Sequence, residues 1–135
     1  MGRAAEEGSP ITPDELQSAL ARFTSSDTLT RHGLTRRILM TQGVVFLAEQ
    51  AQAHWLTDLI VAHQADPRVR LEPFQVWTLS VEAATRNAVA TMTDGNSTQP
   101  ATRQDIPWTD FPLPEITLWF VQEGDHWVML LPSEY

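Results

Sequence analysis

The 135-residue sequence contains no cysteine. A chain without Cys forms neither disulfides nor a Cys-ligated zinc or iron–sulfur site, so it carries no mark of an oxidising or reducing compartment. No uninterrupted apolar run approaches the roughly 18 residues of a membrane span, and residues 1–9 are polar and lack the apolar centre of a signal peptide. We therefore expect a cytoplasmic protein with no membrane partner.

Lysine is also absent, so all nine basic residues are Arg, against 17 acids and a formal charge of -8. Proteins that bind duplexes gain affinity when Lys and Arg release counterions from phosphates, and this charge balance disfavours direct nucleic-acid binding. No base follows Arg103, whereas acids continue to the end of the chain: Asp105, Asp110, Glu115, Glu123, Asp125 and Glu134. Such a stretch predicts a protein partner with a basic surface.

Familiar catalytic patterns are missing as well. No Ser stands in a Gly-x-Ser-x-Gly elbow, and the six glycines form no phosphate-binding run. The four histidines include no His-Glu-x-x-His pair, and their spacing is weak evidence for a metal site. We expect neither a cofactor nor a metal.

The chain length fits one domain, and 42% hydrophobic residues suffice for a core. Residues 1–11 predict a flexible N-terminal tail, and residues 12–135 a single α+β domain. Thr12, Pro13 and Glu15 form a capping box that begins a short helix over 13–23. Residues 44–64 contain neither Gly nor Pro and predict one long central helix that is apolar over much of its circumference.

The remainder is rich in β-forming residues. Strands are predicted, in whole or in part, at 28–41, 74–82, 87–93, 104–109, 115–122 and 126–131. Asp94-Gly95-Asn96 and Glu123-Gly124-Asp125 have the composition of turns. We therefore predict an antiparallel meander of about five strands, with the long and the short helix on one face.

Asp58 is the most informative single residue for chemistry. On a continuous helix it would fall within the apolar stripe, one turn after His54, and a desolvated acid there needs a partner. One hypothesis is a small enzyme of the hydrolase or transferase type, with Asp58 as acid or base oriented by His54. The alternative is an acid satisfied by hydrogen bonds within the fold.

Five tryptophans are a large share for this length, and both faces of the predicted 115–131 hairpin are apolar and need cover. Helices cover one face; the other is covered by a loop or is a partner surface rimmed by acids. The candidate partner-binding residues are Asp105, Trp108, Asp110, Glu115, Trp119, Glu123 and Asp125.

Several short motifs occur together: Thr41-x-Gly43-Val44, Leu47-Ala48-Glu49, Trp55-Leu56-x-Asp58-x-Ile60, Phe74-Gln75-x-Trp77, Asp94-Gly95-Asn96, Thr109-Asp110-Phe111-Pro112-Leu113 and Leu131-Pro132-Ser133-Glu134-Tyr135. Together they resemble a bacterial family of unknown function found in chromosomes and mobile elements. The resemblance covers about residues 14–135 and departs from the family at Gln42, where an acid is associated with the position. It implies a cytosolic prokaryotic or phage-borne protein and marks Asp58, Asp94, Asn96 and Asp110 as positions of interest.

The leading hypothesis is a non-enzymatic acidic interaction protein. Its most concrete form is a mobile-element or phage accessory that blocks a basic, nucleic-acid-binding host defence complex, similar in role to anti-CRISPR or antirestriction proteins. The alternatives are the small enzyme with Asp58 and His54, and a regulatory subunit of a neighbouring gene product. A homodimer stays open.

Overall fold

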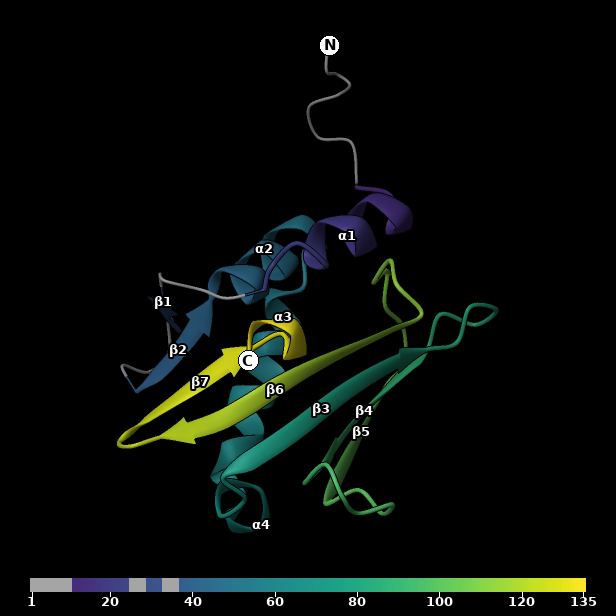
Figure 1. Cartoon of the computed structure of the whole chain (residues 1–135). Coiled ribbons are helices and arrows are strands. Elements are labelled where there is room, and N and C mark those ends of the chain that lie inside the picture. Colours follow the sequence, from purple (N-terminus) through teal and green to yellow (C-terminus); the bar gives the residue numbers. More distant parts are fainter. Residues whose placement is uncertain (1–10, 25–28, 33–36) are drawn as a thin grey trace.

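The computed structural model describes residues 11–24, 29–32 and 37–135, and Figure 1 shows their arrangement. The predicted tail lies, except for Ile11, outside the described residues. The described helices are α1 (Pro13–Leu20), α2 (Gln42–Gln50), α3 (His54–Ala62) and α4 (Pro67–Arg70), with 3₁₀ turns η1 (His63–Ala65) and η2 (Pro132–Glu134). The described strands are β1 (Leu29–Arg31), β2 (Ile38–Thr41), β3 (Phe74–Val81), β4 (Ala88–Thr93), β5 (Thr102–Ile106), β6 (Glu115–Glu123) and β7 (His126–Leu130).

These strands form one sheet in the order β1-β2-β7-β6-β3-β4-β5. The α+β class is as predicted, and antiparallel pairing joins β3 to β4, β4 to β5 and β6 to β7. The five-strand antiparallel meander is wrong in three respects: seven described strands take part, β2 lies parallel to β7, and β6 pairs with β3 rather than with β5. The β2–β7 pair joins segments nearly 90 residues apart, and local hydrophobic patterns carry no signal for such a partner.

The predicted long helix is also wrong, because it is divided into α2 and α3 at residues 51–53. Gln52 adopts the left-handed backbone conformation with φ 52°, while its neighbours Ala51 and Ala53 are buried. A non-glycine residue pays about 1 kcal/mol for this conformation. The division lets each half turn its own apolar side inward, with Leu47 on α2 and Ile60 on α3 almost inaccessible to solvent.

The N-terminal capping signal is confirmed. The Thr12 hydroxyl accepts a hydrogen bond from the Glu15 backbone N–H, and the Glu15 carboxylate accepts one from the Thr12 N–H, each at 3.1 Å. The helix is shorter than predicted, since α1 ends at Leu20. Its buried Leu16 and Leu20 fasten it to the core.

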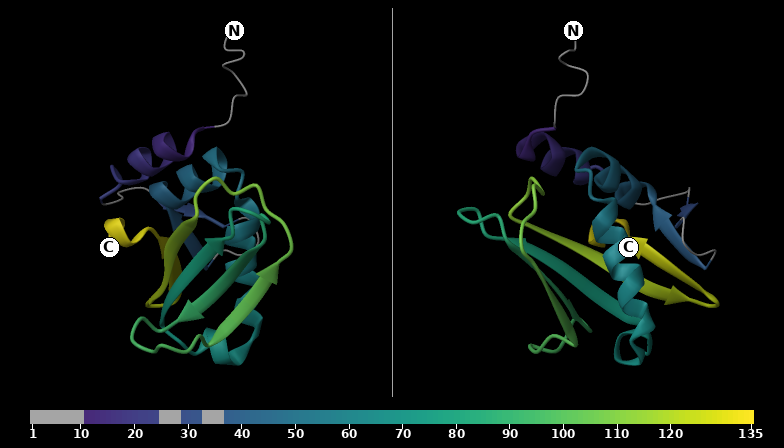
Figure 2. Two further views of the ribbon diagram at one scale, coloured as in Figure 1. Left: turned by 90° about the vertical axis from the view of Figure 1, so that its right-hand side faces the viewer. Right: turned by 180° about the vertical axis from the view of Figure 1, so that it is seen from behind.

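The helices cover one face of the sheet. In the right panel of Figure 2, which shows the molecule from behind, α3 crosses in front of the strands, whereas Figure 1 shows β3, β6 and β7 in front of α3. Every second residue of a strand points to the same face of the sheet. On the face toward α3, Trp77, Leu79 and Leu118 are buried against Leu56 and Ile60. The other parity points away from the helices and supplies the candidate site.

Candidate functional site

The face of the sheet opposite α3 is here called the open face. It is formed by outward-pointing residues of four neighbouring strands, which are half-buried or exposed. They are Phe74, Val76, Thr78 and Ser80 on β3, Val89, Thr91 and Thr93 on β4, Arg103 and Asp105 on β5, and Glu115, Thr117 and Trp119 on β6. Strands β4 and β5 face the viewer in the left panel of Figure 2 with no helix in front of them.

An aromatic cluster occupies the β6 side of the open face. The ring of Trp119 lies 5.0 Å from that of Phe74 and 5.3 Å from that of Tyr135, measured between centroids. Tyr135 meets both rings edge-on and remains 74% exposed. Exposed aromatic groups of this kind are enriched where proteins bind one another.

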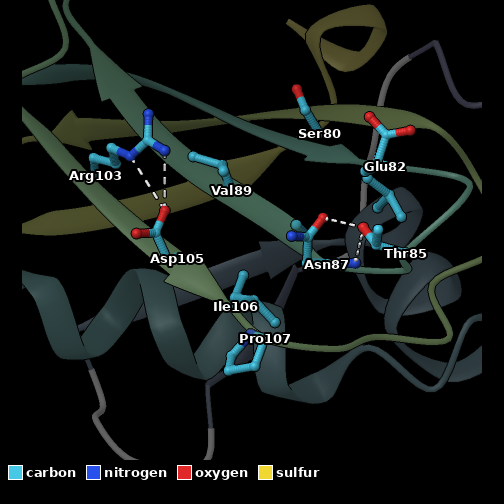
Figure 3. A pocket seen from close by; sticks show the side chains of 11 residues that line it. Ser80, Glu82, Thr85, Asn87, Val89, Arg103, Asp105, Ile106 and Pro107 are labelled. Carbon is cyan, nitrogen blue, oxygen red and sulfur yellow. Dashed lines mark hydrogen bonds and ion pairs between the residues drawn. The ribbon is translucent and has the colours of Figure 1, made fainter.

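Acidic residues lie across the other end of the open face. The strand register places Glu115 beside Ser80, Ser80 beside Val89, and Val89 beside Asp105, so two predicted acids belong to one row. Next to this row is a hollow of about 730 Å³, shown in Figure 3, whose lining includes Glu82 and Asp105.

Arg103 is the basic residue among those that line this hollow, and it forms a salt bridge with Asp105. The Arg103 Nη2 atom lies 3.1 Å from Asp105 Oδ1, and both side chains are mostly exposed. Figure 3 also marks the hydrogen bond that the Thr85 hydroxyl donates to Asn87 Oδ1, 2.6 Å long, between two residues of the β3–β4 turn that line the hollow. The hollow is open to solvent, and its lining combines apolar side chains with the charged groups of Glu82, Arg103 and Asp105.

The seven predicted partner-binding residues divide into separate groups. Asp105, Glu115 and Trp119 lie on the open face, whereas Glu123 and Asp125 lie at the β6–β7 turn. Glu123 lies eight positions after Glu115 along β6, a distance of about 26 Å at the usual strand rise. The acids therefore do not form one continuous patch.

Trp108 and Asp110, the two remaining residues of that set, follow β5. Trp108 is 63% exposed, and Asp110 is exposed between the buried Thr109 and Phe111. Arg86 holds this segment, because its Nε donates to the Thr109 carbonyl at 3.1 Å and its Nη2 to the Phe111 carbonyl at 2.5 Å. The Thr109–Leu113 motif is thus anchored to the fold while Asp110 points to solvent.

Asp58 does not sit in the apolar stripe. It is exposed on α3. Because the chain leaves the helical conformation at Gln52, the residues of α3 do not continue the apolar stripe of α2. Its partner is His32, whose Nε2 lies 2.8 Å from Asp58 Oδ1, rather than the predicted His54, which is exposed at the start of α3. His32 itself is buried, 4% accessible in its side chain. The pair ties the end of β1 to α3, and no local signal in the sequence identifies it.

The other two histidines occupy different places. His63 contacts Gln104 at 2.7 Å and packs on the ring of Trp77, while His126 pairs with Asp125 at 2.7 Å in the β6–β7 turn. Across the described residues, no group of three or more acid or His side chains has the arrangement of a metal site.

Phe74-Gln75-x-Trp77 is a structural motif with one outward residue. Gln75 is fully buried; its amide donates to Gln64 Oε1 and to the carbonyls of Val69 and Glu72, and its oxygen accepts from Trp77 Nε1 at 2.9 Å. These hydrogen bonds hold the segment that connects α3 to β3 against the start of β3. Phe74, together with Val76 at the unspecified position of the motif, points to the open face.

The Thr41-x-Gly43-Val44 motif and the C-terminal Leu131–Tyr135 motif are joined by hydrogen bonds. Glu134 accepts hydrogen bonds from the Thr41 hydroxyl at 2.5 Å, the Gly43 N–H at 3.0 Å and the Leu131 N–H at 3.0 Å. These bonds place its buried carboxylate at the N-terminus of α2, where the helix dipole favours negative charge. Sequence reasoning counted Glu134 among the acids and missed this role, although buried Glu residues need such partners.

Asp94-Gly95-Asn96 is a turn, as predicted. Gly95 has φ +91°, and Asp94 Oδ1 accepts from the backbone N–H groups of Ser97 and Asn96 at 2.7 and 2.9 Å. These bonds, led by that of Ser97, hold the pKa of Asp94 below its ordinary value of 3.8. The hydrogen bonds show a turn with a structural acid.

The chain belongs to the Family of unknown function (DUF6876), which matches it over residues 14–135. The family resemblance expected from the motifs is thus confirmed at the level of an uncharacterised domain. No curated protein and no solved structure matches the chain. None of the helices in the described part of the chain has the length and apolarity needed to cross a bilayer.

Proposed function

We propose that this member of the DUF6876 family is a non-enzymatic interaction protein that docks its open face on a basic surface of a partner protein. The observation that carries the proposal is the composition of that face: an aromatic cluster at one end and a row containing Glu115 and Asp105 at the other. Aromatic groups supply contact area, and rim acids steer a basic partner toward it.

The negative charge of the chain and of the open face is the reason for proposing a partner with a basic surface. The chain carries a formal charge of -8, and Glu82, Asp105 and Glu115 outnumber Arg103 at the hollow end of the open face. A protein groove lined with Arg and Lys to hold nucleic acid is complementary to this arrangement. Docking there would exclude the nucleic acid by competition.

The biological form that we propose is an accessory of a mobile element or phage acting in the cytoplasm against a nucleic-acid-binding defence complex, in the manner of anti-CRISPR or antirestriction proteins. Its support is the charge complementarity together with the family resemblance. A partner of this kind predicts fast association that weakens as salt rises.

The test is affinity capture from a native host lysate at low and high salt, followed by binding measurements on the purified retained complex. Glu115→Arg on the open face is compared with Glu49→Arg, which makes the same charge change on the exposed side of α2. We expect Glu115→Arg to weaken binding about tenfold and Glu49→Arg to change it little. Trp119→Ala should weaken binding as well.

If Glu115→Arg and Glu49→Arg weaken binding equally, the open face is not the binding surface. Retention that is insensitive to salt would contradict electrostatic docking. Loss of nucleic-acid binding by the captured complex when the chain is added would support the inhibitory form, and unchanged nucleic-acid binding would overturn it.

A further inference from the structure

Strand β5 forms one edge of the described sheet, at the end opposite β1. An edge strand carries backbone N–H and C=O groups on its outer side that can pair with another strand. Natural edges are protected by charged residues, and the three central residues of β5, Arg103, Gln104 and Asp105, are exposed. Here the two charges have opposite signs, so the protection depends on the register of pairing.

The alternation of hydrogen-bonded and non-hydrogen-bonded residue pairs in the sheet shows which backbone groups of β5 point away from β4. The Glu82 N–H donates to the Asn87 carbonyl at 2.8 Å, so this pair is hydrogen-bonded across β3 and β4. Because hydrogen-bonded and non-hydrogen-bonded pairs alternate, Ala88 and Ala90 direct their backbone groups toward β5, opposite Ile106 and Gln104. The backbone groups of Arg103 and Asp105 therefore point away from the sheet.

We propose that two copies of this chain associate through antiparallel pairing of β5 with β5, with the two-fold axis at Gln104. In this register Arg103 of each copy lies directly opposite Asp105 of the other. Both pairs use the outward backbone groups, which gives four backbone hydrogen bonds together with two opposite-charge side-chain pairs.

Neighbouring registers are disfavoured by the same two residues. Shifting the axis to residue 103 places the two Arg103 side chains opposite each other, and shifting it to residue 105 places the two Asp105 side chains opposite each other. The charge pattern thus selects one symmetric register. Trp108, which is 63% exposed, follows the end of β5 by two residues.

The pairing would join two sheets edge to edge. Because Arg103 and Asp105 lie on the open face, the open faces of the two copies would continue into each other across the junction. The interface is narrow, so the dimer is expected to be weak and dependent on protein concentration. The dimer does not depend on the partner proposed above.

Sedimentation velocity across a range of protein concentrations tests the dimer. Arg103→Asp and Asp105→Arg each place like charges opposite in the symmetric pair, and each variant is expected to be monomeric where the parent dimerises. Mixing the two variants restores both opposite-charge pairs, so a heterodimer should form. The double variant Arg103→Asp/Asp105→Arg should dimerise like the parent.

Circular dichroism and thermal melts establish that each variant is folded, and Glu115→Arg, on β6, serves as a charge-changing control that should leave the dimer intact. A parent chain that stays monomeric at the highest concentration overturns the proposal. Dimerisation of either single variant as strong as that of the parent, or failure of the mixed variants to associate, overturns it as well. Loss of dimerisation in the control would place the interface elsewhere on the molecule and contradict pairing through β5.

Discussion

Glu134, the penultimate residue, accepts a hydrogen bond from the backbone N–H of Gly43, 91 residues earlier in the chain, at 3.0 Å. The C-terminal segment is therefore an integral part of the fold, because it supplies the acid that satisfies the N-terminus of α2. The same contact joins two of the short motifs noted in the sequence, Thr41-x-Gly43-Val44 and Leu131–Tyr135.

Replacing Glu134 with Ala is expected to destabilise the protein by about 2–4 kcal/mol, because three donors around a buried carboxylate lose their acceptor. Urea unfolding monitored by tryptophan fluorescence measures the change. Exposed Glu115→Ala is the matched control and should change the free energy of unfolding by less than about 0.5 kcal/mol. Equal stability of the two variants would contradict the role assigned to Glu134.

Gly43→Ala should also destabilise, although Ala is normally favoured over Gly in a helix by about 0.5–1 kcal/mol. A Cβ atom at residue 43 would lie 2.5 Å from Leu131 Cδ1 and 2.7 Å from Glu134 Oε1, so these two side chains must shift and the hydrogen bonds of Glu134 are disturbed. We expect a net loss of about 1–3 kcal/mol in the same urea assay. A gain in stability would show that the C-terminal contact is weaker than the geometry indicates.

Gln75→Leu keeps the size of the side chain and removes its polar atoms. Trp77 Nε1 and the Gln64 amide then lose their shared acceptor, and the expected cost is about 2–4 kcal/mol. Thr78→Val, on the same strand but on the open face, is the control and should have little effect. Comparable effects of the two substitutions on the unfolding midpoint would argue against the buried network.

Asp94→Asn tests the charge of the turn. The pKa of Asp94 is lowered in the folded protein, so its carboxylate stabilises the fold above the ordinary pKa of 3.8, and this contribution disappears as pH falls through the lowered value. The variant should be less stable than the parent at pH near 7 and should approach it in acid. Urea unfolding at both pH values measures this, and a difference that is independent of pH would contradict it.

Local sequence signals determined the elements whose stabilising contacts are local. The capping box at Thr12, the Asp94-Gly95-Asn96 turn and the β6–β7 hairpin are confirmed because each depends on residues a few positions apart. The acidity of the second half of the chain is likewise a property of the sequence itself.

The tertiary structure decided what depends on distant neighbours. The break at Gln52 divides a segment with uninterrupted helix propensity, and both resulting helices bury apolar residues, Leu47 on α2 and Ile60 on α3 among them. That break exposed Asp58 and gave it His32 as a partner in place of His54. The same dependence on long-range pairing fixed β2 beside β7, Glu134 at α2, and the split of the predicted acids between two ends of β6.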